Sequence, residues 1–471
     1  MINNIYSTSV ITSYNPARKG FSHYLYWVDF TVLLFLLILQ RMPFTVLEPL
    51  RPLFAVLCIG ILAAVTIKNI MMSMMITSSK LTIVRPHLRL LLLSIFFISL
   101  VFVAYAKVDI THTFSIQTAL VTASFWVAIF IMSSSIFLAP NNYPHRNILR
   151  WGIILAGGTY ILFNVFFHFF SIPLFDVEAR YAEGYADSSL GNSTILALLG
   201  LNQSRMLFPT AAGINSMGPI AGVTLVISLM LFLQRTVIRS LFQKVFASVT
   251  CLASIYVLLG TDSRFSLISV FLTLFFMTLP LLKKFSWFNL GVVLSPLVPL
   301  LLITILNNID SFEFSVLGNL TRNTNDLITF NGRTYLWEAG YRLLSWFQPE
   351  HLWGFGFRSQ AASANAAYLP RFPWNPHPEL HNFALQYVFD LGYIGLLTFI
   401  LLYTTLISRL KLLYRDDPQT GNMLMSMAVY FMFISTIETA LTYYNYEVFT
   451  LLLLMLAANL PEFYKVTPRL R

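Results

Sequence analysis

The sequence predicts an all-α polytopic membrane protein with about twelve transmembrane helices and a large outer loop that carries short helices. Two observations of composition lead to this fold class. Hydrophobic residues make up 57% of the 471-residue chain and charged residues only 11%, with a mean hydropathy of +0.70; soluble proteins carry roughly 25% charged residues. The third observation is a recurrence of apolar segments long enough to cross a bilayer as helices, with no competing β-type alternation.

Twelve segments fit a membrane-spanning helix, which needs about 20 apolar residues. The first 22 residues are polar and lack the apolar core and small-residue cleavage site of a signal peptide. The first span is therefore expected to be an uncleaved anchor. The predicted spans are 24–40, 52–68, 89–106, 114–138, 150–171, 215–234, 244–260, 264–282, 285–307, 383–408, 421–439 and 445–461.

The distribution of positive charge predicts that both termini are cytoplasmic. With this orientation 19 of the 30 Lys and Arg residues fall in inner segments, and every inner segment has some. Seven of the remaining 11 lie in two long outer loops, which the positive-inside rule weights little. Because the basic residues mark topology, the net charge of +10 does not indicate nucleic-acid binding.

The predicted spans divide the chain into three parts. Residues 1–307 hold the first nine spans and an outer loop near 172–214, residues 308–382 form a second outer loop, and residues 383–471 hold the last three spans and a cytoplasmic tail. Long loops in compact domains are usually functional or disordered. Within the second loop, a 3.6-residue apolar period predicts a helix over 334–347 that lies along the membrane surface.

The basic residues expected outside are ten Arg and one Lys, Lys107. Arginine presents a planar, permanently charged fork that binds phosphate and carboxylate groups through two hydrogen bonds. Either the bias is chance, or the outer side handles an anionic ligand. The arginines are Arg41, Arg51, Arg180, Arg205, Arg264, Arg322, Arg333, Arg342, Arg358 and Arg371.

Several polar residues lie where helices are expected to begin on the outer side, and helix N-termini attract anions. Arg264 opens the eighth span and Arg333 the surface helix, while Arg205 and Asn215 lead into the sixth span. Arg264 has an ordinary alternative as an interface cation or a partner of Asp262. Arg333 has one as a solvated loop charge.

His381, which opens the tenth span with Asn382, is the candidate general base. A helix N-terminus disfavours a charged imidazole, so a neutral ring is expected that can take a proton from a hydroxyl. The ordinary alternative is a hydrogen-bonded boundary histidine. His351 and His377 are weaker candidates.

Other polar and aromatic residues have simpler explanations. Arg342 lies nine residues after Arg333, about 180° away on a helix, and is expected to be structural. Trp337, Trp353 and Trp374 are expected to anchor the membrane interface. The acids Asp29, Asp390 and Glu438 fall near helix ends, where an ionised side chain can reach water. The two cysteines, Cys58 and Cys251, lie in apolar segments, and no pattern of metal ligands is present, so no catalytic metal or other cofactor is expected.

Five features, taken in order, make the sequence resemble the bacterial O-antigen ligase and O-antigen polymerase superfamily of membrane glycosyltransferases of the GT-C type. They span roughly residues 200–400. An Arg precedes a Gly-rich segment with Asn (Arg205, Gly213, Asn215), although the usual Asn-Pro-Asn is not reproduced. The other four are Ser263-Arg264, Gly332-Arg333 before an aromatic-rich helix, Gly354-Phe355-Gly356, and His381-Asn382 followed by Gly392-Tyr393-Ile394-Gly395.

The resemblance implies an enzyme of the bacterial inner membrane with its active site on the periplasmic face. It implies a donor glycan linked to undecaprenyl diphosphate, with Arg264, Arg333 and Arg205 binding the diphosphate and Asn382 and Asn215 in support. His381 would activate the acceptor hydroxyl, with inversion at the anomeric carbon and no required metal. A sugar acceptor, the lipid bilayer and, as a candidate, a chain-length regulator protein are the implied partners.

Three functions remain open at this point. Polymerisation of a surface polysaccharide (O-antigen, capsule or exopolysaccharide) is the first, and ligation of the finished chain to lipid A-core is the second. A flippase or transporter for the lipid-linked glycan is the alternative from another class, although transporters usually show paired repeats with discontinuous helices, which the sequence does not reveal. A non-catalytic scaffold would leave the outer Arg bias unexplained.

Overall fold

The structure, a computed structural model, is helical throughout the part of the chain that it describes. The described residues are 60, 63–64, 67, 85–107, 142–170, 193, 195–196, 200–201, 204–209, 217–233, 241–279, 287–308, 333–357, 359 and 379–442. No strand occurs among them, which confirms the all-helical fold class. The elements are α4 Arg85–Ala106, α6 Asn142–Phe169, α9 Gly218–Leu233, α10 Leu241–Thr261, α11 Arg264–Thr278, α13 Trp287–Leu294, η5 Ser295–Leu297, α14 Val298–Asn308, α17 Arg333–Leu344, α18 Glu350–Trp353, α20 Phe383–Asp416 and α21 Pro418–Ser435.

Within the described residues, 4 helical stretches are long and apolar enough to cross a membrane, namely Arg150–Phe169, Leu241–Thr261, Phe288–Ile305 and Phe383–Arg415. The apolar stretches Leu92–Ala106, Gly218–Leu233 and Arg264–Thr278 are shorter. The predicted spans 24–40, 114–138 and 445–461, and nearly all of 52–68, lie outside the described residues. The protein is therefore an α-helical membrane protein, and the count of about twelve spans stays a prediction.

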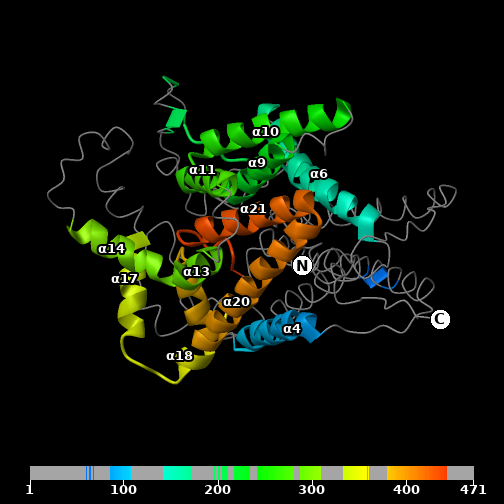
Figure 1. The fold of residues 1–471 in the computed structure, drawn as a ribbon. Helices are drawn as coiled ribbons and strands as arrows, with labels where there is room; N and C mark the ends of the chain where they lie inside the picture. Colours follow the sequence, from blue (N-terminus) through cyan, green and yellow to red (C-terminus); the bar gives the residue numbers. More distant parts are fainter. Residues whose placement is uncertain are drawn as a thin grey trace, which may run out of the picture.

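Helices α9 and α21 form the centre of the helical body. Almost every residue of α9 is buried, as are most residues of α21, including Met423, Met427 and Tyr430. A helix that is apolar all round is expected to be enclosed by others. Helices α6, α10 and α11 pack around α9, while α20 packs against α21 and carries α4 on its other side (Figure 1).

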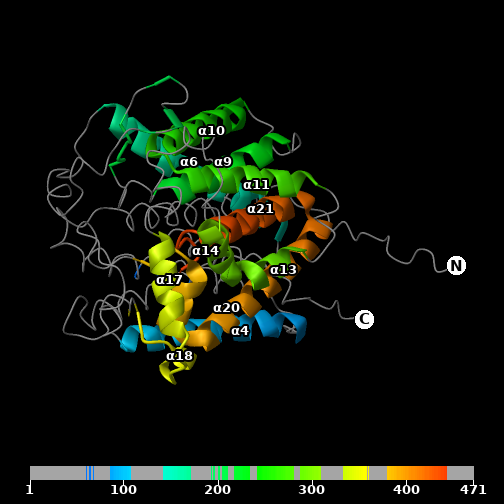
Figure 2. The ribbon, with the colours of Figure 1, turned by 90° about the vertical axis from the view of Figure 1, so that its left-hand side faces the viewer.

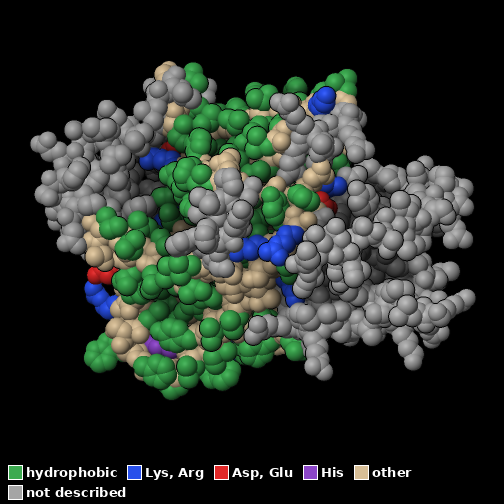
Figure 3. Space-filling model, viewed as in Figure 1, with side chains coloured by type: hydrophobic (Ala, Val, Ile, Leu, Met, Phe, Trp, Pro, Cys, Tyr) green, Lys and Arg blue, Asp and Glu red, His purple; other side chains and the backbone are tan. Residues whose placement is uncertain are grey.

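The outer helices turn apolar side chains away from this core. Leu252 of α10, Phe271 of α11 and Leu397 of α20 are 67%, 64% and 58% exposed, respectively. Figure 3 shows that hydrophobic side chains cover much of the described surface on that face. Soluble proteins rarely expose continuous apolar surface on this scale, whereas lipid-facing helices do so by necessity.

Helix α20 is interrupted at Gly392, which adopts φ 74° and ψ −178° within an otherwise helical run. A positive φ favours glycine because it has no Cβ. The break releases the Phe389 and Asp390 carbonyls, and the N–H groups of Phe355 and Gly356 donate to them at 2.7 and 3.3 Å. The Gly-x-Gly turn that follows α18 thus supplies the hydrogen bonds that the helix loses.

The two glycine motifs pack backbone against backbone at this break. A Cβ on Gly354 would lie 2.3 Å from the Asp390 carbonyl oxygen, and a Cβ on Gly392 would lie 2.3 Å from backbone atoms of Leu352. Gly354 and Gly356, on either side of Phe355, both have a positive φ, which suits the tight turn after α18. The break at Gly392 was not predicted from the sequence.

Candidate active site

Helix α17 positions Arg333, the first residue of the candidate site. It begins at Arg333, within one residue of the expected start, and lies against α14 and the beginning of α20 (Figure 2). Trp337 is fully buried against Leu380, Leu385 and Phe389, and its indole N–H donates to the Leu380 carbonyl at 2.8 Å. The expectation that Trp337 anchors the membrane interface was therefore wrong, because this indole joins α17 to the segment before His381.

Arg333, the first residue of α17, is only 4% exposed. One guanidinium nitrogen, Nη2, forms an ion pair with Glu438. The guanidinium carbon stands 5.2 Å from the centre of the Phe265 ring, which is a cation–π distance. The other terminal nitrogen, Nη1, is buried without a hydrogen-bond partner among the described residues. Arg333 is thus no solvated loop charge, and it retains donor capacity inside the site.

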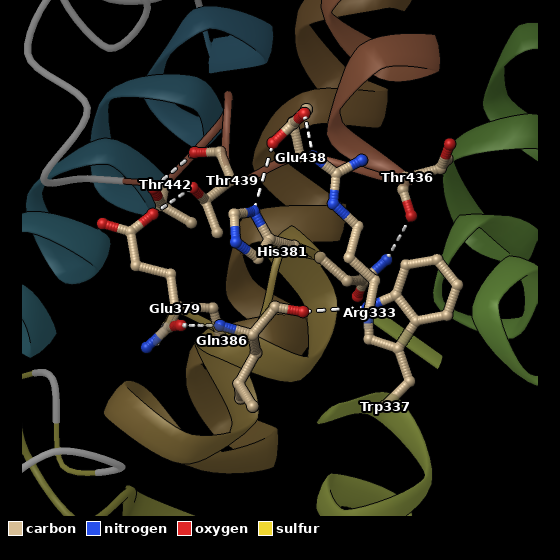
Figure 4. Close-up of polar contacts among 11 residues, drawn as sticks. Arg333, Trp337, Glu379, His381, Gln386, Thr436, Glu438, Thr439 and Thr442 are labelled. Carbon is tan, nitrogen blue, oxygen red and sulfur yellow. Dashed lines mark hydrogen bonds and ion pairs between the residues drawn. The ribbon is translucent and has the colours of Figure 1, made fainter. Parts of the chain in front are cut away.

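The backbone around His381 is held from both directions. The N–H of Leu380 donates to the Gln386 side chain at 3.2 Å, and the Leu380 carbonyl accepts from Trp337. His381 itself has a φ of 47°, a left-handed conformation that costs a non-glycine residue roughly 1–3 kcal/mol. Such strain persists where the surroundings fix the chain, and here they fix the imidazole above the start of α20 (Figure 4).

Asn382 is the N-cap of α20 and anchors His381 from the other side. Its Oδ1 accepts from the Leu385 N–H at 2.9 Å, and its Nδ2 donates to the Thr436 carbonyl at 2.8 Å. The first contact satisfies a free amide of the helix end. The second joins this helix end to the loop after α21, from which Glu438 reaches the site.

Glu438 is the residue that brings the site together. Its Oε1 pairs with Arg333, and its Oε2 lies 3.2 Å from His381 Nδ1. Burial by itself would raise the pKa of Glu438, but the positive charge of Arg333 and the hydrogen bonds from His381 and Arg333 outweigh it and hold this pKa below its ordinary value. The carboxylate is therefore ionised at neutral pH and accepts from both partners.

Sequence reasoning missed Glu438, which it placed near a helix end where an acid can reach water. Helix α21 ends at Ser435, so Glu438 lies in the loop beyond it, but its side chain is only 18% exposed and points at Arg333 and His381. One general rule could have identified Glu438 from the sequence: an acidic residue within a membrane-embedded segment is a functional candidate.

A second acid lies on the opposite side of the imidazole. Glu379 accepts a hydrogen bond of 2.6 Å from the Thr439 hydroxyl, and Thr442 donates to the Thr439 carbonyl at 2.5 Å. Figure 4 shows the His381 ring between Glu438 and this Glu379–Thr439 pair. Neither residue was given a functional role from the sequence.

The other predicted anion-binding arginines lie at the turn between α10 and α11. Arg264 pairs with Asp262 at 3.2 Å, as its ordinary alternative proposed, and its side chain is 30% exposed. Arg205 donates through Nε to the Thr261 carbonyl at 3.0 Å, so it lies at the same turn. Phe265, which follows Arg264, contacts Arg333 and connects this turn to the first group. Asn215 lies outside the described residues.

Two residues given weaker or structural roles from the sequence lie in structural positions. Arg342 is exposed and pairs with Glu338 at 3.0 Å on the outer face of α17. His351 is buried, and its Nδ1 accepts from the Gln348 N–H at 3.3 Å, a contact between the short α18 and the residue two positions before it. His377 lies outside the described residues. The part of the chain that the structure describes holds no group of three His, Cys, Asp or Glu side chains placed to bind a metal.

The arrangement has the parts of a general base and an anion site side by side. A carboxylate that accepts from Nδ1 of a neutral imidazole fixes the proton there and leaves the lone pair of Nε2 for proton abstraction. A buried guanidinium with a free N–H beside it stabilises negative charge that develops during a reaction. The same carboxylate holds both groups, so their relative position is fixed.

Comparison with known proteins points to one family. Residues 249–400 match the model of the O-antigen ligase family. This match includes Arg264, Arg333 and His381, whereas Glu438 lies beyond it. No curated protein and no solved structure matches the chain significantly. The resemblance stated from the motifs is confirmed over residues 249–400, the part of the chain that matches the O-antigen ligase family.

Proposed function

We propose that the protein transfers a glycan from undecaprenyl diphosphate to a sugar hydroxyl on the periplasmic face of the bacterial inner membrane. The observation that carries this proposal is the Arg333–Glu438–His381 group. It joins a buried arginine, whose Nη1 has no hydrogen-bond partner within the described residues, to a histidine that contacts the same carboxylate. Leaving-group stabilisation and base catalysis are the two aids that glycosyl transfer from a lipid diphosphate needs.

In the proposed reaction, the acceptor hydroxyl oxygen attacks the anomeric carbon of the donor and forms the new C–O bond. Its proton moves to Nε2 of His381, and the resulting imidazolium is stabilised by Glu438. The bond between the anomeric carbon and the phosphate oxygen breaks, and its electron pair leaves with the undecaprenyl diphosphate. Attack opposite the leaving group inverts the anomeric configuration.

In this proposal Arg333 binds both Glu438 and the donor diphosphate. Nη2 holds Glu438, so Nη1 is the terminal nitrogen that remains for a diphosphate oxygen. A lysine at this position would supply one ammonium group without the planar fork that faces both partners. Arg264 and Arg205, at the neighbouring α10–α11 turn, extend the positive charge along the path of the diphosphate.

Polymerisation is the activity that we place first: the growing chain moves from its lipid diphosphate onto the sugar of another lipid-linked unit. Ligation of the finished chain to lipid A-core is the second. Both use the same donor and the same chemistry and need no metal. They differ in the acceptor alone, and a chain-length regulator protein is a candidate partner of the polymerase.

Transport of the lipid-linked glycan is less well supported. The break in α20 is a feature that transporters share, since unwound carbonyls there coordinate substrate or ions. Here the freed carbonyls of Phe389 and Asp390 accept from Phe355 and Gly356, and the Ser359 hydroxyl also donates to Phe389. They are occupied by the protein itself.

Reconstitution tests the proposal. Purified protein in proteoliposomes is given the undecaprenyl-diphosphate oligosaccharide that accumulates in cells lacking this protein, with or without lipid A-core. Longer lipid-linked chains support the polymerase, and glycan joined to lipid A-core supports the ligase. Translocation of the glycolipid without a new glycosidic bond would instead support the flippase and contradict the proposal.

A further inference from the structure

We propose that Gln386, oriented by the buried Asp390, is a positioning residue for His381, because its side chain holds the backbone directly before the imidazole. This inference rests on the function proposed above, in which His381 is the base. It assigns a role to Asp390, a buried acid that the proposed reaction does not use, and to the break in α20.

The backbone conformation of His381 needs support from its surroundings. Its φ of 47° lies in the left-handed region, which costs free energy in a residue other than glycine. A return of this φ to a negative value would move the Cβ and the whole imidazole relative to the chain before it. The contact of 3.2 Å between Nδ1 and Glu438 Oε2 would then be lost.

Leu380, the residue before His381, is held at both of its backbone polar groups. Its N–H donates to Gln386 Oε1 at 3.2 Å, and its carbonyl accepts from the Trp337 indole at 2.8 Å. The two side chains reach this segment from opposite sides (Figure 4). Leu380 is fully buried, so removal of the Gln386 oxygen would leave a buried N–H without water to replace it.

Asp390 completes the orientation of the Gln386 amide. A backbone N–H can only donate, so the amide must turn Oε1 toward Leu380. Its NH₂ group then faces the other way, and Nε2 donates to Asp390 Oδ1 at 3.0 Å. A carboxylate accepts hydrogen bonds, so it selects the NH₂ group over the amide oxygen. Asp390 thus favours the one orientation of the amide that also satisfies Leu380.

The break in α20 fixes the position of Asp390. The Asp390 carbonyl, released by the non-helical Gly392, accepts from the Gly356 N–H at 3.3 Å. The backbone of Gly354 lies so close that a Cβ there would stand 2.3 Å from the same carbonyl oxygen. The glycine turn after α18 therefore holds Asp390, which in turn orients Gln386.

The polarity of this pair is costly without such a role. Gln386 and Asp390 lie one turn apart on a helix that is long and apolar enough to cross a membrane, and both are 0% exposed. An amide and an acid buried in such a helix cost free energy that two apolar side chains would not. Their position just after the base is explained if they hold the chain from which His381 projects.

An exchange of hydrogen-bonding groups tests the proposal. Gln386→Glu keeps an acceptor for Leu380 but turns a second carboxylate oxygen toward Asp390. We expect it to lower the kcat of transfer about 10- to 100-fold, as a small displacement of a catalytic group does. The donor KM and the affinity for undecaprenyl diphosphate should not change. Adding Asp390→Asn returns an NH₂ group to the pair, so the double variant should recover most of the lost kcat.

Solid-state NMR of protein labelled with ¹⁵N-histidine provides a readout that a general loss of stability would not produce. The signals of His381 are those that disappear in His381→Ala. We expect a proton on Nδ1 in the natural protein and in the double variant, and a mixture of tautomers in Gln386→Glu. Gln386→Met, which removes both hydrogen bonds, should lower kcat and alter these signals in the same way, and it carries the test if Gln386→Glu does not fold.

Gln348→Glu, at an exposed glutamine between α17 and α18, is the matched control and should leave kcat and the histidine signals unchanged. Natural kcat in both Gln386 variants, or a lower kcat with unaltered His381 signals, would overturn the proposal. A double variant no more active than Gln386→Glu would contradict the pairing with Asp390. If the natural protein forms no glycosidic bond from the lipid-linked oligosaccharide, the proposed function fails, while the NMR comparison still decides whether Gln386 positions His381.

Discussion

Replacing Glu438 by glutamine removes the charge that joins Arg333 to His381 and keeps the shape of the side chain. The Arg333 side chain, which is 5% exposed, is then left buried without its counter-ion. A glutamine amide can also turn its NH₂ toward Nδ1 of His381, which favours the tautomer that has its proton on Nε2. In that tautomer Nε2 is no longer a base.

Both consequences have expected magnitudes. Removing one member of a buried ion pair costs about 3–5 kcal/mol. Because Glu438 is 18% exposed, we expect the lower end of this range, about 3 kcal/mol, for the free energy of unfolding. Loss of general base catalysis lowers the rate of transfer by about 10²- to 10⁴-fold.

The assay combines glycan transfer in proteoliposomes with thermal unfolding of the detergent-purified protein. Glu338→Gln is the matched control, because Glu338 also pairs with an arginine but is exposed on α17. An exposed pair of this kind contributes about 0.3–0.5 kcal/mol, so both readouts should stay near those of the natural protein. Transfer by Glu438→Gln at more than half the natural rate would refute the assigned role of Glu438.

Four further predictions follow from the same geometry. Arg333→Lys should lose most of its transfer activity because one ammonium group cannot face Glu438 and the donor as the guanidinium does, and near-normal turnover would count against that role. His381→Ala should bind undecaprenyl diphosphate as the natural protein does but stop transfer, and full activity would remove the base assignment. The folded-state pKa of Glu438 is lowered, so its contribution to stability is present above its ordinary value near 4.3 and lost as pH falls below it; unfolding curves of Glu438→Gln and the natural protein should therefore converge at acid pH, and a constant difference would be inconsistent with this. Gly392→Ala should lower the melting temperature by several degrees, because its φ is 74° and its new Cβ would meet the Leu352 backbone; an unchanged melting temperature would show that the break tolerates a side chain.

The elements that carry local signals could be predicted from the sequence. The 3.6-residue period and the Gly332-Arg333 step predicted α17, and an Asn before an apolar run is a helix N-cap signal that places His381 at the start of α20. The apolar runs predicted the helices of the bundle. These features depend on neighbouring residues, so one sequence is sufficient to detect them.

The contacts that make the site depend on residues far apart in the chain. Glu438 follows His381 by 57 positions and Arg333 by 105, and nothing local distinguishes it from an acid at a helix end. The buried position of Trp337 has the same cause, since its partner Leu380 is 43 residues away. The break at Gly392 lies inside an apolar run, and it becomes evident only when the turn at Gly354 is seen to supply the missing hydrogen bonds.

The most direct test of the central claim is the structure of the product. The natural protein is incubated with the lipid-linked oligosaccharide, and NMR defines the linkage and the anomeric configuration of any new bond. We predict one new glycosidic bond per undecaprenyl diphosphate released, with the anomeric configuration inverted relative to the donor and no product from His381→Ala. A retained configuration, or release of the lipid diphosphate without a new glycosidic bond, would contradict the account.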